Sequence, residues 1–575
     1  MVFYIDVGSL VVEYYYMIGK INSGVNNFFK PQNKANKLKG ETELSVFYMN
    51  DAHGDINRAA NMKTAKDCFE KQNKAGAHLT LAAGDMLYGN DPKRIGFITK
   101  FLNAMKIDAT ALGNHEFHYG SEFLAKNLKN IDTTAVCCNI DIPEGNGLKD
   151  RMAEKKLVKS AVFMKGGHKF GIIGASPFDT DITVKEKQDG TGIKQMSVDQ
   201  TIKAINEEAK ILEKQGINKI ILCTHTGYGE HADLRIAKET EGVDIIIGGH
   251  SHTVIDGANK EDKGGDHKLN VVKSRRGEPV VITQAGKLNK YAGFLNVIFD
   301  KNGVIKEDSI VNKLTDTKEF APNKGIQNIL TATLGQNKVL SNPKHTYMPI
   351  NEFQDRYMEN PVVNVVSDAI LAGARKVDKD VIAELHPTNN LKKCVDGPVT
   401  TYNVKYDMLP YNCNYAIVEI TEEDLVKTLE ATSGNLFKDF DPELLRCAGM
   451  RYTIDENADK GINGHIKSLE FVDDKNNVIK SIDVKNPSKT NKLKIVMDTF
   501  LFKEKNTKDI LAPYTKDAKS VGTEQDLFIN YLEENKDVDF DKKPEKRIQI
   551  NYQNLDKYCY QYPMEDKYAA LGLDK

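Results

Sequence analysis

Short apolar segments alternate with helical patterns between residues 41 and 300, and this alternation predicts the fold of the first part of the chain. The apolar segments are "SVFYMN", "HLTLAAGD", "ATALGNH", "HKFGIIGAS", "KIILCTHT", "VDIIIGGH" and "VVITQAG". Between them, segments such as 58–76, 91–105 and 197–216 repeat apolar residues at three- and four-residue spacing, as amphipathic helices do. Strands that are apolar on both faces are typical of buried sheets covered by helices. The pattern therefore predicts a layered α/β domain.

The rest of the chain has a different pattern. A Lys-, Asn- and Thr-rich stretch contains one helical segment, "GIQNILTATLGQ", and is predicted to be a linker. After it come predicted helices at 361–376 and 422–434 and predicted strands "NYAIVEI", "GMRYTID" and "LKIVMD", a mixed α+β pattern. The predicted organisation is an N-terminal extension (1–40), a first domain (41–300), a linker with a helix (301–350), a second domain (351–550) and a polar tail (551–575).

Composition and charge exclude several classes of protein. The 575 residues are 40% hydrophobic and 28% charged, with a net charge of −2, so no overall field favours a nucleic acid polymer as partner. No uninterrupted apolar stretch approaches the roughly 20 residues that cross a bilayer, so no membrane span is predicted. The apolar N-terminus has no basic start and is interrupted by Asp6 and Glu13, so a signal peptide is not expected. As written, the chain is predicted to be cytoplasmic.

Possible metal ligands lie at the ends of five of the predicted strands. Side chains at the carboxyl ends of strands in an open α/β sheet meet at one edge, where sites form. One strand-end histidine alone is a weak signal, but five strands that each end in such side chains indicate a metal site. The residues are Asp51, His53, Asp85, Asn114, His115, His225, His250 and His252.

The types of ligand indicate the metal and its chemistry. Carboxylate, imidazole and amide ligands without thiolates suit divalent Mn, Zn, Fe or Co better than calcium. The group is too large for a single tetrahedral ion and matches two ions about 3.5–4 Å apart that share a carboxylate. Such a pair generates hydroxide from a bridging water near neutral pH and stabilises phosphoryl oxygens during in-line displacement. We therefore expect two divalent metal ions as cofactors.

The ordered motifs of the first domain resemble those of a known family. "NDAHGD", "AGDMLYGND", "GNHEFHYG", "THTGYGE" and "GGHSHT" are similar to the motif set of the calcineurin-like metallophosphoesterases, and most of all to the 5′-nucleotidase branch with its UDP-sugar hydrolases and 2′,3′-cyclic-nucleotide phosphodiesterases. The resemblance implies a four-layer α/β/β/α sandwich followed by a smaller α+β substrate-binding domain. Members of this family are mostly periplasmic or cell-surface proteins, so the location of this chain stays open.

The resemblance also implies a role for each strand-end residue. One metal would be held by Asp51, His53, Asp85 and His252, and the other by Asp85, Asn114, His225 and His250, with Asp85 bridging. Asn114 would in addition face the substrate. His115 matches the family's histidine that is not a ligand and that stabilises the transition state or protonates the leaving oxygen.

His118 departs from the family pattern, which usually has Asp at this position, paired with the catalytic histidine. We include His118 with His115 in the catalytic set. A protonated His118 would repel a charged His115, so we expect His115 to be less readily protonated and activity to be lower or shifted in its pH dependence. The alternative is that His118 points away and another carboxylate orients His115.

The second domain is similar to the family's substrate-binding domain but less closely. "DRYMENPVVNVVSDAI" would place Arg356 on the substrate phosphate, and "YDMLPYNCNYAIVEI" would place Tyr411 against a nucleobase. Lys392 stands where the family has Arg, and "LFKEKNTKD" replaces a Gly-Gly-Asp-Gly-aromatic motif, which removes one wall of the base-binding slot. The alternative for Arg356 and Tyr411 is ordinary surface or core packing.

Two functions from different classes follow. The leading hypothesis is a two-metal phosphohydrolase, similar to a 5′-nucleotidase, that releases phosphate from nucleotides or related phosphate esters. Its choice of substrate would be altered or relaxed and would include cyclic phosphodiesters or UDP-sugars. The alternative is a metal-binding but catalytically weak protein that binds a ligand or acts at a surface. A P-loop NTPase and a serine hydrolase are not supported, because neither GxxxxGK[ST] nor GxSxG is present.

Overall fold

The computed structural model describes most of the chain, and the chain divides into two compact units, Met1–Gln336 and Asn337–Lys575. Two of the predicted substrate-binding residues, Arg356 and Lys392, lie outside the described residues. The described residues are 29, 38–73, 76–89, 91–178, 192–258, 260, 268–342, 359–387, 398–433, 444–455, 464–538, 540 and 545–551.

The first unit contains a seven-stranded sheet with the order β15-β14-β1-β2-β3-β4-β6. Strands β1 to β4 and β6 are parallel, and β14 and β15 add antiparallel strands at one edge. Val46 in β1, for example, lies between Leu79 of β2 and Leu295 of β14. The strands are β1 (Thr42–Met49), β2 (Ala77–Ala82), β3 (Ala109–Ala111), β4 (Thr134–Val136), β6 (Leu157–Val158), β14 (Tyr291–Phe299) and β15 (Val311–Asp316).

A six-stranded sheet forms the other half of this unit, with the order β12-β13-β11-β10-β8-β7. Its four central strands are parallel, and β7 and β12 are antiparallel to their neighbours. The parallel strands read as near-continuous apolar runs because both of their faces are buried. The strands are β7 (Ser160–Lys165), β8 (His168–Ala175), β10 (Ile220–Thr224), β11 (Ile245–Ile247), β12 (Val271–Lys273) and β13 (Pro279–Thr283).

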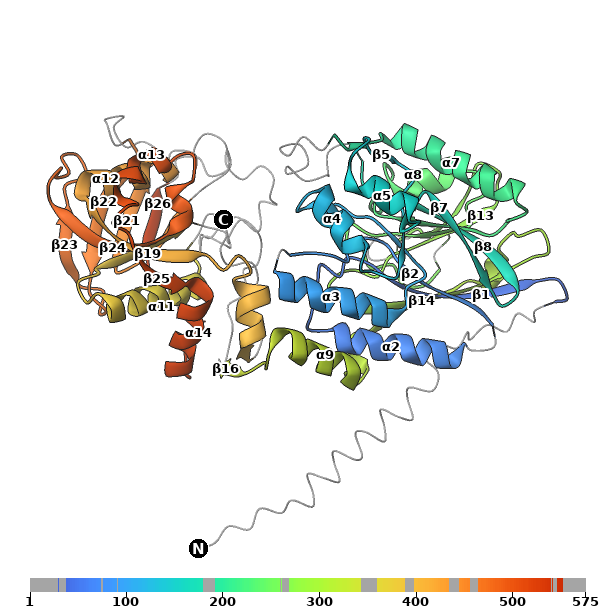
Figure 1. Cartoon of the computed structure of the whole chain (residues 1–575), viewed down its shortest axis with the longest axis horizontal. Helices are drawn as coiled ribbons and strands as arrows, with labels where there is room; N and C mark the ends of the chain where they lie inside the picture. The colour runs from blue at the N-terminus through green and yellow to red at the C-terminus, as the bar shows by residue number, and fades with distance from the viewer. Residues whose placement is uncertain are drawn as a thin grey trace, which may run out of the picture. The chain divides into compact units, whose positions relative to one another are not determined.

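The two sheets pack face to face and helices cover their outer faces (Figure 1). Val46 of β1 and Ile221 of β10 belong to one buried cluster between the sheets. Leu222, the next residue of β10, points to the opposite face and packs in a cluster with helix α7 (Val198–Lys214). On the other side, Phe69 of helix α2 (Ala59–Gln72) packs against Phe47 of β1, with ring centroids 5.6 Å apart. The unit is therefore a four-layer α/β/β/α sandwich.

Local sequence signals start the helices that flank the sheets. Helix α3 (Pro92–Met105) begins with Pro at its first position, and the Asp91 side chain accepts a hydrogen bond from the Arg94 N–H at 2.6 Å. Helix α7 begins with a capping box between Ser197 and Gln200. Proline and capping residues satisfy or avoid the unpaired N–H groups of a first helical turn.

The first unit extends beyond residue 300, where the sequence predicted the first domain to end. Residues 301–350, predicted as a linker, contribute strand β15 to the seven-stranded sheet and helix α9 (Lys324–Leu334), which contacts α2 and α3. Strand β16 (Val339–Ser341) already belongs to the second unit, where it pairs with β18 (Val399–Thr400). In the described part of this stretch, the polar composition matches the edge position of β15 and the largely exposed surface of α9.

The second unit has the mixed α+β architecture. A five-stranded sheet has the order β20-β17-β24-β19-β25, and a four-stranded sheet has the order β23-β22-β21-β26. Two apolar clusters fill the unit, one with helix α12 and one with helices α11 and α14. The elements are α11 (Pro361–Val377), α12 (Glu422–Ser433), α14 (Glu524–Glu534), β17 (Ala383–Pro387), β19 (Asn414–Thr421), β20 (Leu445–Ala448), β21 (Met450–Asp455), β22 (Ile466–Val472), β23 (Val478–Ile482), β24 (Lys492–Asp498), β25 (Lys519–Thr523) and β26 (Ile548–Asn551).

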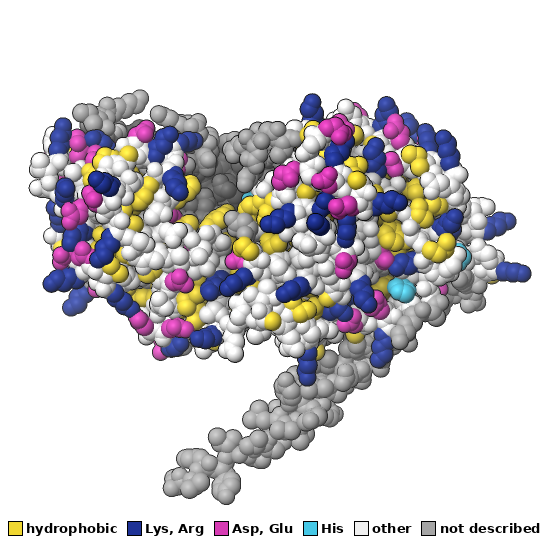
Figure 2. All heavy atoms as spheres, viewed as in Figure 1, with side chains coloured by type: hydrophobic (Ala, Val, Ile, Leu, Met, Phe, Trp, Pro, Cys, Tyr) yellow, Lys and Arg dark blue, Asp and Glu magenta, His cyan; other side chains and the backbone are white. Residues whose placement is uncertain are grey.

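The described surface matches the small net charge of the chain. Figure 2 shows basic and acidic side chains interspersed over the face that it presents, with apolar side chains between them. Within the part of the chain that the structure covers, every helix is too short or too polar to cross a membrane.

Candidate active site

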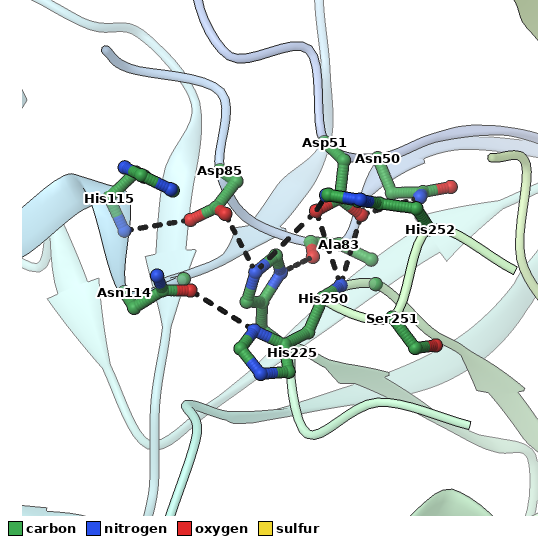
Figure 3. A network of polar contacts seen from close by, with 12 residues as sticks. Asn50, Asp51, Ala83, Asp85, Asn114, His115, His225, His250, Ser251 and His252 are labelled. Atoms are coloured by element: carbon green, nitrogen blue, oxygen red, sulfur yellow. Dashed lines mark hydrogen bonds and ion pairs between the residues drawn. The ribbon is translucent and has the colours of Figure 1, made fainter. Parts of the chain in front are cut away.

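The predicted ligands converge at the carboxyl edges of the two sheets of the first unit, and Figure 3 labels all of them except His53. They come from the loops that follow β1, β2, β3, β10 and β11. Three groups of side chains offer ligand atoms within 4.8 Å of one another: Asp51, His53 and His252; His53, Asp85 and His115; and Asp51, Asp85 and His225. Strands from both sheets therefore deliver carboxylates and imidazoles to one place.

The backbone at this site has an unusual conformation. Five of the predicted ligands have positive φ: Asp51 (49°), His53 (47°), Asp85 (53°), His250 (74°) and His252 (55°). Residues other than glycine rarely adopt this left-handed backbone conformation, and those that do cluster at functional sites. Two hydrogen bonds between the loops after β1 and β2 stabilise this backbone conformation. The Asp51 N–H donates to the Gly84 carbonyl (3.1 Å), and the His53 N–H donates to the Asp85 carbonyl (2.8 Å).

Two carboxylates and a histidine form the buried centre of the site. Asp51, Asp85 and His225 are 0%, 1% and 0% exposed. The Nδ1–H of His225 donates to the Ala83 carbonyl at 2.6 Å, and its Nε2 atom lies 3.0 Å from Asp85 Oδ2 and 3.7 Å from Asp51 Oδ1. Burial lowers the pKa of His225, but the charge of Asp85 outweighs it and raises that pKa to about 10. The carboxylates thus create a strong local preference for a cation.

A second convergence involves His53, His252 and Asp51. The Nε2 atoms of the two histidines are 3.0 Å apart, and they lie 3.5 and 3.3 Å from Asp51 Oδ1. Burial alone would raise the pKa of Asp51, but hydrogen bonds from His252 and His53 hold it well below its usual range. Asn50 orients this carboxylate: its amide donates to Asp51 Oδ2 at 2.7 Å, and its own oxygen accepts the Ala285 N–H at 2.7 Å.

Asn114 and His250 lie together on the other side of the site. Asn114 Oδ1 is 3.1 Å from His250 Nδ1, and the His250 N–H donates to Asp51 Oδ2 at 3.0 Å. Both side chains are half-buried, and their polar atoms face each other. The amide oxygen of Asn114 and the imidazole of His250 add an oxygen and a nitrogen donor to the buried centre (Figure 3).

This donor set fits divalent metal ions. It combines two buried carboxylates, several imidazoles with ring nitrogens directed inward, and an amide oxygen, all within the reach of a few ions. The His225 contact with the Ala83 carbonyl fixes the ring orientation, which is the usual arrangement behind a metal-binding histidine. The residues present therefore suit divalent metal ions.

His115 begins the short helix η2 (His115–Phe117), and its N–H donates to Asp85 Oδ1 at 2.8 Å. Its ring lies edge-on to the ring of Tyr88, with centroids 4.7 Å apart, and its buried Nδ1 forms no hydrogen bond with a described residue. Burial, together with the charges of His53 and His118, lowers the pKa of His115 to about 4 against the opposing effect of Asp85. His115 is thus held neutral and close to the carboxylates.

His118 lies beside His115. The two rings are stacked, with centroids 5.6 Å apart and an interplanar angle of 24°. Tyr88 contacts both rings, at 4.7 Å from His115 and 5.5 Å from His118. The geometry therefore differs from the alternative in which His118 points away, and it places two imidazoles and a phenol ring at one edge of the site.

Two buried charged residues near the site are absent from the set predicted from the sequence. Arg94 of α3 donates to the Gly54 carbonyl, next to His53. Glu116 accepts hydrogen bonds from backbone N–H groups in two of the ligand loops. A Glu directly after the Asn-His pair was visible in the sequence, but its partners become adjacent only when strands β2 and β3 pair.

In the second unit, Tyr411 lies in the turn before β19 and is 53% exposed. Phe500, in the short helix η6 (Thr499–Phe502) that follows β24, is 54% exposed. Strands β19 and β24 are antiparallel neighbours, and Tyr415 pairs with Asp498. Tyr411 precedes the first residue of β19 and Phe500 follows the last residue of β24, so both exposed aromatic residues lie at the same end of this strand pair. Phe500 was not recognised from the sequence.

Comparison with known families and proteins identifies both parts of the chain. Residues 44–254 match the calcineurin-like phosphoesterase family, and residues 339–503 match the 5′-nucleotidase C-terminal domain. The trifunctional nucleotide phosphoesterase protein YfkN of Bacillus subtilis (strain 168) is 26% identical over 457 residues, which are 73% of this chain and 30% of that protein. A snake venom 5′-nucleotidase of Crotalus adamanteus is 29% identical over 314 residues, 50% of each chain. The chain thus spans half or less of the length of these two relatives.

A solved structure has the same fold. The 5′-nucleotidase precursor from Thermus thermophilus superposes with a TM-score of 0.54 and 23% identity, and the match covers 89% of this chain and all of that one. The family matches in both units agree with this likeness and with the order of the two units along the chain. The chain therefore contains a calcineurin-like phosphoesterase domain that precedes a 5′-nucleotidase C-terminal domain.

Proposed function

We propose that this protein is a metal-dependent phosphohydrolase that releases phosphate from nucleotides or related phosphate esters. The observation that carries the proposal is the convergence of two buried carboxylates and the histidines around them at the carboxyl edges of both sheets. Left-handed backbone at five of these residues supports it, because such strain persists where function requires it. The relatives named as nucleotide phosphoesterase and 5′-nucleotidase support the substrate class.

Two divalent ions are proposed as cofactors, and Asp85 would contribute to the binding of both. One would be held by the group around Asp51, and the other by the group around His225. The proposed ligand sets are Asp51, His53, Asp85 and His252, and Asp85, Asn114, His225 and His250. When bound, such ions activate water for attack and neutralise charge that develops on the phosphoryl group.

The protein side chains supply binding and proton transfer. The Asn114 amide has N–H groups left to donate to a phosphoryl oxygen while its oxygen faces His250. His115, whose pKa is lowered to about 4, is neutral near pH 7 and can donate a ring N–H to the phosphoryl or leaving oxygen. His118 stacks on His115 and restricts its ring, so we assign it a positioning role next to the catalytic imidazole.

Nucleobase recognition is proposed for the second unit. Tyr411 offers an exposed ring, and Phe500 offers a second one at the same end of the β19–β24 pair. Such rings stack on any base, which favours a relaxed choice among nucleotides, including cyclic phosphodiesters and UDP-sugars, over strict selection of one base. Arg356 and Lys392 remain proposed contacts to substrate phosphate groups.

A second candidate is a catalytically weak protein that binds metal and ligand. The observation that favours it is the stacking of His118 on His115, because an imidazole cannot stabilise a protonated neighbour as a carboxylate does. Metal bound in full, together with no turnover of any phosphate ester, would support this candidate.

The test is phosphate release by the purified protein with added Mn²⁺. The substrates are AMP, UMP, UDP-glucose, a 2′,3′-cyclic nucleotide assayed with an added phosphatase, and an aryl phosphate, each with and without chelator. Turnover of at least one nucleotide that chelator abolishes is expected. Asp85→Asn should lower it by about 10³-fold, because ions stabilise such transition states by several kcal/mol. Turnover that resists chelator, or an Asp85→Asn variant as active as wild type, would contradict the proposal.

A further inference from the structure

Glu116 has a specific arrangement of hydrogen bonds beneath the ligand loops. It lies in η2, directly after His115, and is 5% exposed. Its Oε2 atom accepts the N–H groups of Asp85 (2.8 Å) and Gly113 (2.7 Å), and its Oε1 atom accepts those of Met86 (2.7 Å) and Leu87 (2.9 Å). One buried carboxylate therefore accepts four backbone hydrogen bonds from two separate loops.

These loops carry the central ligands of the site. The N–H groups at 85–87 belong to the turn that places Asp85 in its left-handed conformation, with φ of 53°. The N–H of Gly113 belongs to the loop that leads into Asn114 and His115. Hydrogen bonds to an ionised acceptor are about twice as strong as neutral ones, so a carboxylate at this point ties the two loops together.

The surroundings of Glu116 exclude a direct part in the chemistry. Its oxygens point at backbone N–H groups, and the rest of the side chain faces an apolar cavity of about 20 Å³ lined by residues that include Leu102, Leu112 and Leu128. A carboxylate with both oxygens engaged in this way has no access to substrate. Its effect must pass through Asp85 and Asn114.

We propose that Glu116 is a positioning residue that sets the separation and orientation of the Asp85 and Asn114 ligands. Two hydrogen bonds to Oε2, one from each loop, fix the distance between these loops, and the two to Oε1 hold the turn after Asp85. The inference rests on the proposed metal-dependent function and adds to it a residue that controls the affinity for metal.

Direct metal binding tests this role. Glu116→Gln keeps the size of the side chain but replaces one acceptor by an NH₂ group that faces backbone N–H groups. The matched control is Glu430→Gln: Glu430, in the second unit, also accepts backbone hydrogen bonds, from His465 (2.9 Å) and Ile466 (2.6 Å). Chelator-stripped proteins are titrated with Mn²⁺ in a calorimeter, and phosphate release and thermal unfolding are measured on the same samples.

Glu116→Gln should bind Mn²⁺ about 10–100-fold more weakly than wild type, as is usual when a group that orients metal ligands is lost. Glu430→Gln should bind Mn²⁺ with the same affinity as wild type, even if its thermal stability falls. Equal Mn²⁺ affinity for Glu116→Gln and wild type, or equal weakening by both variants, would overturn the inference.

The outcome is separable from that of the proposed function. Wild-type protein that binds no Mn²⁺ would overturn the proposed function, whereas wild-type binding without an effect of Glu116→Gln would overturn only the role of Glu116. If Glu116→Gln does not fold, Glu116→Asp replaces it. This variant keeps the charge but is too short to reach both loops, so its Mn²⁺ affinity should also fall, and unchanged affinity would overturn the inference.

Discussion

Gly113 is a position where one added methyl group should disable the site. It lies between β3 and Asn114, and a Cβ atom there would be 2.1 Å from Asp85 Oδ1, 2.7 Å from the Asp85 nitrogen and 2.8 Å from Asp85 Cγ. Its φ is not in the left-handed region, so alanine introduces no backbone strain of its own. Gly113→Ala therefore tests the packing against Asp85 alone.

The size of the effect follows from these distances. Ordinary contacts of a Cβ atom begin near 3.4 Å, so the Asp85 carboxylate has to retreat by more than about 1 Å. A displacement of this size at a catalytic group costs about 10²-fold in rate. Overpacking in a well-packed interior costs about 1–3 kcal/mol of stability, so the variant should still fold.

The assay is chelator-sensitive phosphate release from a nucleotide, with thermal unfolding as the check on folding. Gly76→Ala is the matched control, because a Cβ atom at Gly76 has no neighbour within 4 Å and its φ is not left-handed. Gly76→Ala should be as active as wild type. If Gly113→Ala kept more than half of wild-type activity, the placement of Asp85 at the catalytic centre would be refuted.

Two further outcomes are expected. Tyr411→Ala should raise KM for AMP and UMP about tenfold and leave turnover of an aryl phosphate unchanged, because stacking contributes about 1–3 kcal/mol per base; an equal effect on both substrate types would contradict a role in base binding. Burial raises the pKa of Asp233 to about 6 although Thr224 and Thr226 donate to it, so the folded state holds this proton more tightly than the unfolded chain. The free energy of unfolding should therefore fall by about 3 kcal/mol as pH rises from about 4 to about 6, and Asp233→Asn, compared by thermal unfolding in a pH series, should lack this fall.

Much of the site could be predicted from the sequence because its residues sit at the ends of strands. Apolar runs that stop at Asp51, Asp85 or His225 show both where a strand ends and which side chain follows it. Parallel strands align their carboxyl ends, so residues far apart in the chain could be expected at one edge without knowledge of the strand order. The α/β class followed from the same alternation of periods.

Other features depended on long-range pairing. The edge position of β15, which extends the first unit beyond residue 300, is decided by its pairing with β14, and its polar sequence resembles a linker. Phe500 lies near the start of β19, the strand that follows Tyr411, because β19 and β24 pair. The sequence alone does not show this pairing. Neither feature has a local signature, because exposed edges and turns place few demands on composition.

The sequence by itself determined the chemistry available, namely which carboxylates, imidazoles and amide stand at the strand ends and in what order. Only the tertiary structure decided how they are held. The left-handed backbone at Asp85 and the four hydrogen bonds accepted by Glu116 arise where the loops after β2 and β3 meet. The physical reason is that side-chain type and period are local properties of a chain, whereas the satisfaction of a buried charge depends on which backbone groups the fold brings to it.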